Sequence, residues 1–521
     1  MVNASLPSVA QRWAVFLFAL VFVAGFDGMW SGKRYPYAAD SASYIEMAQT
    51  LYHDGHPRVT PWDFDESKAD QIPQKLFPPG YPLLIAAVMP FTGEARTAAL
   101  IPGRIAAVAI PVLLLWLFAG ALPARVLALY SVYALMTPGV RGWQFLAYSD
   151  VPALAVAILA LGALARGLQL VGDARRPLMW CVVAGFAAGC AYVIRNAGLA
   201  VLAISVVMVV ESFWRRRAWR EAVAVAGGAV GPLAALWAYN LSTFGRWQPY
   251  AMPASTRPWF LNVADWARAT FLDAGVPWQF AEPLPPVVSL VVVGAALSVL
   301  ALAFFRLHAD PRRRALLMLL GGYAVGGGVL LILSRSRYEW GNTIDDRNTL
   351  QYTWALVFAL LIAVPTLWRD RAVRRCGWIA RGALAVVFAA SVFDALSVGL
   401  APVEWWQEMA TDDAVIRAAR VEPGTLQVSN QAVLFRIGAG APVRNIEISG
   451  SDRDLVNALQ RIRREAAGRP AQLLLVCDQY TLGFSACGGR PVPTVPAPRC
   501  ETLREPTPRV LRCPVAPPDP S

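Results

Sequence analysis

Two aspartates stand where apolar stretches of the chain end or begin, and both could take part in chemistry at a membrane surface. Asp40 follows the first apolar stretch, in the segment YAADSASY (37–44), and Asp150 opens a later one, in YSDVP (148–152). An ionised carboxylate can take a proton from an acceptor hydroxyl or hold a cation beside a phosphate leaving group. Each aspartate also suits a helix start, Asp40 as the cap of a helix from Ser41 and Asp150 shortly before a proline. The two roles can coexist.

Several cations could accompany these acids. Arg195 lies between an apolar stretch and the segment NAG (196–198). Arginine close to hydrocarbon usually has an anionic partner, and its planar fork suits a lipid phosphate. The alternative is an arginine whose head group reaches water from a tight hairpin. Lys75, Arg337 and Arg347 are further candidates for contact with a phosphate.

A metal site is a further candidate near Asp40. His53 and His56 form a His-x-x-His pair, and Asp63, Asp65 and Glu66 follow them in the same segment. Imidazole and carboxylate groups are common ligands of divalent cations. The spacing fixes no third ligand, so a divalent metal is an optional cofactor and no other cofactor is predicted.

The composition indicates a membrane protein. Of 521 residues, 56% are hydrophobic and 16% charged, with a mean hydropathy of +0.44. Soluble domains carry about 25% charged residues, and a membrane span needs about 20 mostly apolar ones. We predict an α-helical polytopic membrane protein of about eleven spans, in residues 13–30, 100–122, 124–138, 151–170, 178–194, 197–210, 222–239, 287–305, 315–333, 350–367 and 378–400.

The basic residues predict the orientation of these spans. The net charge is +12, and arginines cluster in the short segments 166–176, 215–220, 306–314 and 369–375, each after an even-numbered span. Short basic loops stay in the cytoplasm, so the charge is an orientation signal and nucleic acid is excluded as a partner. The N-terminus is then cytoplasmic and the C-terminus is periplasmic or extracellular.

This orientation places the candidate acids on the outer face. The loop with Asp40 (31–80), the loop with Asp150, and residues 241–286 and 334–349 all face outward. Residues 81–89 are too short to span a membrane and are predicted to form a re-entrant or interfacial helix.

The chain divides near residue 400 into a membrane domain (1–400) and a C-terminal segment (401–521) of soluble composition. Alternating patterns predict a small extracytoplasmic α/β domain with a Pro-rich tail. Helices are expected at 404–419 and 452–466, and strands at 426–428, 443–448 and 472–476. This segment holds four cysteines, Cys477, Cys487, Cys500 and Cys513. An even set of this kind fits disulfides in an oxidising compartment, and the sequence leaves all three possible pairings open.

These features together resemble the membrane-embedded GT-C glycosyltransferases, in the group of the dolichyl-phosphate-mannose protein mannosyltransferases and the lipid A aminoarabinose transferase. The matching positions are Asp40 with Tyr44 and Ala48 in the first outer loop, Lys75 before the Pro-Pro step FPPGYP (77–82), the second outer aspartate Asp150, Arg195 with Gly198 and Leu199, and VSN (428–430). One departure is Asp40-Ser41, where many relatives have Asp-Glu, so a second candidate acid is missing.

The resemblance implies an inverting glycosyltransferase of the cytoplasmic (inner) membrane. An acceptor hydroxyl of a lipid, glycan or protein would attack a polyprenyl-phosphate-linked sugar among the membrane lipids. Asp40 would be the general base and Asp150 would orient the sugar or acceptor, while Arg195 and Lys75 would stabilise the leaving phosphate. Tyr44, Tyr81, Arg337 and Arg347 would complete the binding site. The alternatives are a transporter or flippase of a polyprenyl-linked lipid and a non-catalytic scaffold.

Overall fold

The computed structural model describes residues 6–30, 39–61, 71–144, 146–172, 174–249, 254–276, 284–339, 344–369, 374–400, 425–429, 443–446, 452–466, 469–477, 500–504 and 510–515. The predictions for Asp63, Asp65, Glu66, Cys487, Asn430 and the helix at 404–419 fall outside these residues. The chain divides into two compact units. The helical unit comprises Met1–Met29, Lys75–Tyr81 and Ile101–Ala401, and the second unit comprises Trp30–Gln74, Pro82–Leu100 and Pro402–Ser521.

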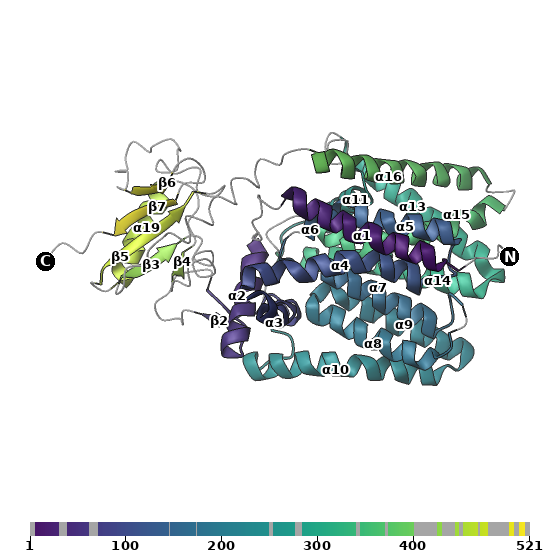
Figure 1. Ribbon diagram of the computed structural model, residues 1–521, viewed down its shortest axis with the longest axis horizontal. Coiled ribbons are helices and arrows are strands. Elements are labelled where there is room, and N and C mark those ends of the chain that lie inside the picture. Colours follow the sequence, from purple (N-terminus) through teal and green to yellow (C-terminus); the bar gives the residue numbers. More distant parts are fainter. Residues whose placement is uncertain are drawn as a thin grey trace. The chain divides into compact units, whose positions relative to one another are not determined.

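Apolar helices build the helical unit (Figure 1). They are α1 (Val9–Trp30), α4 (Ala95–Leu117), α5 (Ala124–Met136), α6 (Pro138–Trp143), α7 (Asp150–Gly167), α8 (Pro177–Ile194), α9 (Leu199–Arg216), α10 (Trp219–Phe244), α11 (Trp259–Asp273), α13 (Pro286–Arg306), α14 (Pro311–Arg337), α15 (Asp346–Arg369) and α16 (Arg374–Leu400), with the 3-10 turns η1 (Asn196–Gly198) and η2 (Leu307–Ala309).

Eight helices among the described residues are long and apolar enough to cross a membrane. Shorter apolar helices are found at Val9–Gly25, Gly80–Thr92, Ala124–Met136 and Arg381–Phe393. Each of the eleven predicted stretches overlaps a helix, but the count of eleven spans stays a prediction. Residues 81–89 lie within α3 (Gly80–Thr92), and the segment 241–286, predicted as a loop, contains α11.

Glycines allow α8 and α10 to pack closely. A Cβ atom at Gly185 of α8 would lie 1.9 Å from the carbonyl oxygen of Val225, and one at Gly228 of α10 would lie 2.2 Å from that of Val182. Side chains at these positions would therefore force the helices apart. This pair of helices, together with α7 beside α8, carries Arg195 at the end of α8 (Figure 1).

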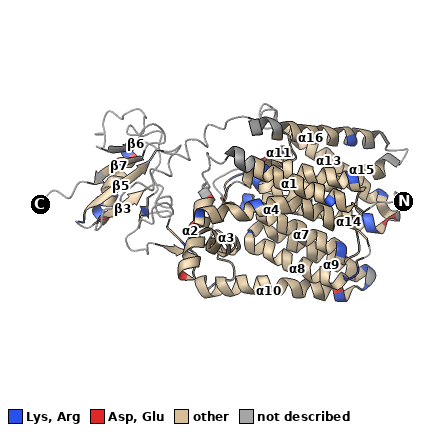
Figure 2. Ribbon diagram, in the orientation of Figure 1, with Lys and Arg blue, Asp and Glu red and all other residues tan. Residues whose placement is uncertain are grey.

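Basic residues gather where α9 ends and α14 begins (Figure 2). Arg215 pairs with Glu211 at 2.8 Å in the last turns of α9. At the start of α14, the backbone N–H of Arg313 donates to Oδ1 of Asp310 at 3.1 Å. Because α9 and α14 pack together, basic segments far apart in sequence belong to the same end of the helical unit, which is consistent with the predicted orientation.

In the second unit, a buried glutamate links the helix that carries Asp40 to the residues that follow it. Glu46 of α2 (Ala39–Asp54) is 1% exposed. It accepts hydrogen bonds from the backbone N–H of Thr60 at 2.8 Å, from its hydroxyl at 2.6 Å, and from Gln71 Nε2 at 2.9 Å. These bonds fix the antiparallel pair β1 (Arg58–Val59) and β2 (Ile72–Pro73) on α2. The helix that carries Asp40 is thereby tied to the segment that follows it.

The C-terminal part of the second unit contains a five-stranded mixed sheet in the order β4-β3-β5-β7-β6. Its elements are β3 (Leu426–Ser429), β4 (Arg444–Asn445), α19 (Asp452–Glu465), β5 (Ala471–Val476), β6 (Glu501–Arg504) and β7 (Val510–Val515). The predicted strands at 426–428 and 472–476 overlap β3 and β5, and the predicted helix at 452–466 overlaps α19. The strand predicted at 443–448 overlaps β4 only at Arg444–Asn445, and its last two residues fall outside the described ones. The strands β6 and β7 were not predicted. Leu455 and Ile462 of α19 pack on Val428, Leu473 and Leu511 of the sheet.

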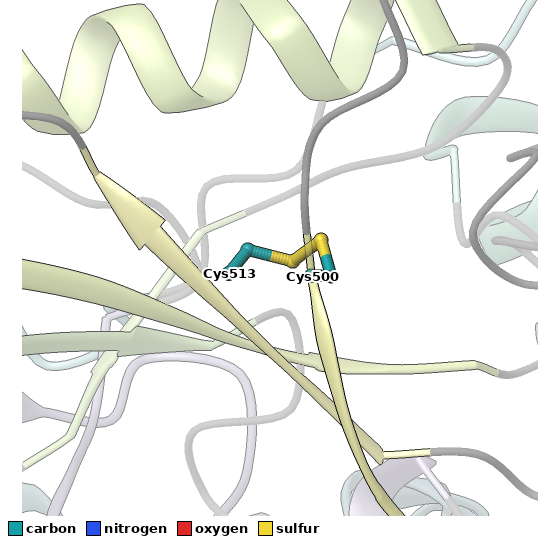
Figure 3. Close-up of a disulfide and its surroundings, with 2 residues drawn as sticks. All are labelled: Cys500 and Cys513. Carbon is teal, nitrogen blue, oxygen red and sulfur yellow. A yellow bond between two sulfur atoms is a disulfide. The ribbon is translucent and has the colours of Figure 1, made fainter.

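Two of the four predicted disulfide cysteines are paired with each other. A disulfide joins Cys500, just before β6, to Cys513 of β7 (Figure 3). This pairing excludes the two connectivities that separate these residues. Cys477 is also disulfide-bonded, whereas Cys181 and Cys190 of α8 are free thiols.

The α8–α10 contact can be tested with two neighbouring glycines. Gly228→Ala places a Cβ against the backbone of α8 and should destabilise the protein by about 1–3 kcal/mol, as overpacking does. Gly227→Ala is the matched control, because nothing lies within 4 Å of its added Cβ and alanine favours helix by up to about 1 kcal/mol over glycine. Thermal unfolding of the purified proteins measures the difference, and equal melting temperatures would contradict the packing.

Candidate functional site

A buried carboxylate of the helical unit is paired with two arginines. Asp150, in the first turn of α7, is fully buried. Arg195 Nη1 lies 2.7 Å from its Oδ1, and Arg347 Nε donates to its Oδ2 at 3.1 Å. A buried carboxylate is stable only when paired in this way. The structure therefore brings together three residues that the sequence singled out separately.

The chain direction changes at Arg195, and this change aims its side chain. α8 ends at Ile194, Arg195 is extended (φ −152°, ψ 136°), and η1 follows at once. A Cβ atom at Gly198 would lie 2.3 Å from the carbonyl carbon of Ala191, so the sharp turn depends on glycine. Arg195 Nη1 also donates to the hydroxyl of Ser149 at 3.3 Å.

Arg347 is held from a second side by an aromatic ring. Its guanidinium carbon lies 4.1 Å from the ring centre of Tyr148, which in turn meets Trp143 edge to face at 5.3 Å. Such cation–π contacts favour a fixed guanidinium. Asp345 precedes Arg347 and accepts from the backbone N–H of Asn348 at 3.1 Å. Burial raises the pKa of the Asp345 carboxyl, and the Arg347 charge opposes that rise.

The geometry suits anion binding. The side chains of Arg195 and Arg347 remain 14% and 17% exposed, whereas Asp150 is 0% exposed. A guanidinium carries five N–H donors, and the contacts of Arg195 with Asp150 and Ser149 involve Nη1 alone. Asp150 thus fixes two arginines whose side chains remain partly exposed.

The segment with Lys75 and Tyr81 packs next to this cluster. A Cβ atom at Gly80 would lie 2.4 Å from the carbonyl oxygen of Val193, two residues before Arg195. The glycine therefore lets the FPPGYP segment reach the end of α8. Tyr81 is fully buried, whereas Lys75 is exposed and presents its ammonium group to the surroundings.

Other predicted residues lie in the second unit. Asp40 is half-buried in the first turn of α2, which begins at Ala39. Tyr44 is 2% exposed. His53 and His56 are exposed at the end of α2, and no group of three histidine, cysteine or acidic side chains that could hold a metal occurs among the described residues. The metal site at these histidines stays a prediction, as do the catalytic roles.

At the end of α14, the structure places a second arginine beside the predicted one. Arg337 is exposed and lies 5.7 Å from the ring centre of Tyr338. Arg335, which the sequence analysis missed, is only 4% exposed and pairs with Glu339 at 2.8 Å. Its Nη1 also donates to the Ser255 hydroxyl at 3.3 Å. A charge next to an apolar stretch is a usable signal, and it applies to Arg335 as well as to Arg337.

The fold is similar to that of solved membrane glycosyltransferases. ArnT from Cupriavidus metallidurans bound to undecaprenyl phosphate superposes with a TM-score of 0.55 at 13% identity, covering 98% of this chain and 99% of that one. The Archaeoglobus fulgidus oligosaccharyltransferase in complex with Zn and sulfate superposes with a TM-score of 0.51 at 14% identity, covering 88% of this chain and 67% of that one. Arabinofuranosyltransferase AftD from Mycobacteria superposes with a TM-score of 0.54 at 16% identity, covering 99% of this chain and 40% of that one.

No protein-family model matches the sequence, and no curated protein matches it. At such low identities the structural likeness establishes the fold. These three neighbours are GT-C glycosyltransferases, so the resemblance in the sequence and the likeness in structure agree on the GT-C fold.

The anchoring role of Asp150 can be tested by stability. Asp150→Asn removes the charge that compensates two largely buried arginines and should cost on the order of 3 kcal/mol. Glu211→Gln is the control, because it breaks an ion pair in which the Arg215 side chain is 57% exposed, and such surface pairs contribute about 0–1 kcal/mol. Chemical or thermal unfolding measures both. An Asp150→Asn protein as stable as the wild type would argue that Asp150 acts on substrate instead.

Proposed function

We propose that this protein is an inverting glycosyltransferase that moves a sugar from a polyprenyl-phosphate donor to an acceptor hydroxyl at the outer face of the cytoplasmic membrane. The observation that carries the proposal is the pair of arginines held by the buried Asp150 at the start of α7. In a GT-C fold, two fixed guanidinium groups at one end of the helices suit a lipid phosphate, which their planar forks can bind through charge-assisted hydrogen bonds.

The reaction requires a leaving group and a base. The acceptor oxygen attacks the anomeric carbon, the bond from that carbon to the phosphate oxygen breaks, and the phosphate leaves with the electron pair. Arg195 and Arg347 stabilise the charge on the departing phosphate, with Lys75 as a further cation. Asp40 takes the proton of the acceptor hydroxyl.

Asp150 has a different role from the one first considered. It was predicted to orient the sugar or the acceptor. Because the arginines engage both of its oxygens and none of its surface is exposed, we propose that it positions Arg195 and Arg347. Tyr44 and Tyr81 are almost fully buried, so we assign them packing roles within their own units, while the exposed Arg337 remains a candidate for the lipid phosphate.

The membrane setting follows from the helices and the charges. Eight apolar helices and the basic end formed by α9 and α14 support a multi-pass protein with that end in the cytoplasm. The opposite ends of the helices, where α7 and α15 begin, would then face outward. The disulfide between Cys500 and Cys513 supports an extracytoplasmic C-terminal α/β domain.

Loss of the base should abolish transfer without loss of fold. Asp40→Asn should reduce sugar transfer by about 10²–10⁴-fold, the usual contribution of a general base. Its melting temperature should stay at the wild-type value, because Asp40 lies half-exposed in a first helical turn. Asp54→Asn, at the exposed last residue of the same helix, is the matched control.

The measurement is the gain in mass of lipid, glycan or protein acceptors in cells that contain the wild-type protein, each variant or no protein. A sugar-sized gain with the wild type and Asp54→Asn, and none with Asp40→Asn, is expected. Transfer by Asp40→Asn at the wild-type rate would show that another group is the base. No gain with any form would favour the transporter or the scaffold.

A further inference from the structure

A buried polar side chain lies one helical turn beyond Arg347 in α15. Gln351 of α15 is 1% exposed, and neither its Oε1 nor its Nε2 has a hydrogen-bond partner among the residues that the structure describes. Burying an amide without hydrogen bonds costs free energy, and native structures contain few such groups. Leucine or methionine would fill this position at no such cost, so the amide calls for a functional explanation.

The helix places this amide next to the arginine pair. Residues four apart lie on the same face of an α-helix, separated by about 6 Å along the axis at about 1.5 Å per residue. Gln351 is therefore one turn further into the helical unit than Arg347, which contacts Asp150. A group attached to a phosphate at Arg347 and directed inward would meet Gln351.

The position of Gln351 is fixed by its neighbours in the sequence. The hydroxyl of Tyr352 donates to the carbonyl oxygen of Ala197 in η1 at 3.2 Å. A Cβ atom at Gly327 of α14 would lie 2.1 Å from the Tyr352 ring, so this ring fills the space left by the glycine. These contacts hold α15 in register with the turn that follows Arg195, and the amide and the two arginines share one rigid frame.

The unpaired atoms indicate which ligand fits. Nε2 needs an acceptor and Oε1 needs a donor. A phosphate at neutral pH offers acceptors only and would leave Oε1 unpaired, whereas a hydroxyl group is both donor and acceptor. Adjacent hydroxyls on a sugar ring match both atoms of one amide.

We infer that Gln351 is a specificity-determining residue that binds hydroxyl groups of the sugar in the polyprenyl-phosphate donor, an inference that rests on the proposed function. Gln351 contributes to the choice of sugar and not to the binding of the lipid phosphate.

The experiment compares lipids with and without a sugar. The purified full chain in nanodiscs is titrated with undecaprenyl phosphate and with a panel of undecaprenyl-phosphate-linked hexoses and pentoses, and binding is measured by the shift in melting temperature. The wild type should bind at least one sugar-bearing lipid more tightly than undecaprenyl phosphate. Gln351→Met should lose about tenfold in affinity for that lipid and stay within about twofold for undecaprenyl phosphate.

Three further variants separate the possible explanations. Arg347→Gln should weaken the binding of both kinds of lipid. Thr353→Val, whose hydroxyl donates to the carbonyl of Thr349 in its own helix, should change neither. If Gln351→Met does not fold, Gln351→Asn withdraws the amide by one methylene and should show the same selective loss.

Two results would overturn the inference. One is a Gln351→Met protein that melts at a higher temperature than the wild type and binds every sugar-bearing lipid equally well. This result would indicate that the wild-type amide binds only an ordered water. The other is a wild type that binds undecaprenyl phosphate but prefers no sugar-bearing lipid. A wild type that binds none of the lipids would instead overturn the proposed function, and this inference with it.

Discussion

The helical unit depends on the need to compensate a negative charge buried at the start of α7. Asp150 is 0% exposed, and the two arginines that neutralise it come from distant parts of the chain. α7, the turn after α8 and the start of α15 must therefore meet at one point, because moving any one of them would leave a charge without its partner in a medium of low dielectric. The close glycine contacts at Gly80 and Gly198 bring the backbone to that same point.

This arrangement links stability to function. A cluster of one carboxylate and two arginines is a weak source of stability compared with apolar packing of equal volume, but it fixes two guanidinium groups whose edges remain partly exposed. Gln351 follows the same pattern, since its buried amide lowers stability unless something binds it. The helices around both features are apolar and closely packed, and they offset these costs.

Much of the helical unit could be predicted from the sequence because apolar length alone identifies membrane helices. The sequence analysis missed α11 for two reasons. The segment Trp259–Asp273 mixes polar with apolar residues, and it is too short to span a membrane. Asp150, Arg195 and Arg347 were each identified as residues able to do chemistry. Their association was not predicted, because Arg347 is 197 positions from Asp150 and only packing brings them together. Gln351 carried a signal, a polar residue within an apolar helix, that was not used.

The most direct test of this account is an experimental structure of the protein with undecaprenyl phosphate bound, in which the distances from the phosphate oxygens to the guanidinium nitrogens are measured. The account predicts phosphate oxygens about 2.7–2.9 Å from nitrogens of Arg195 and Arg347, with Asp150 still paired to both arginines. A phosphate bound elsewhere on the protein, or an Asp150 carboxylate turned from the arginines toward the ligand, would contradict it.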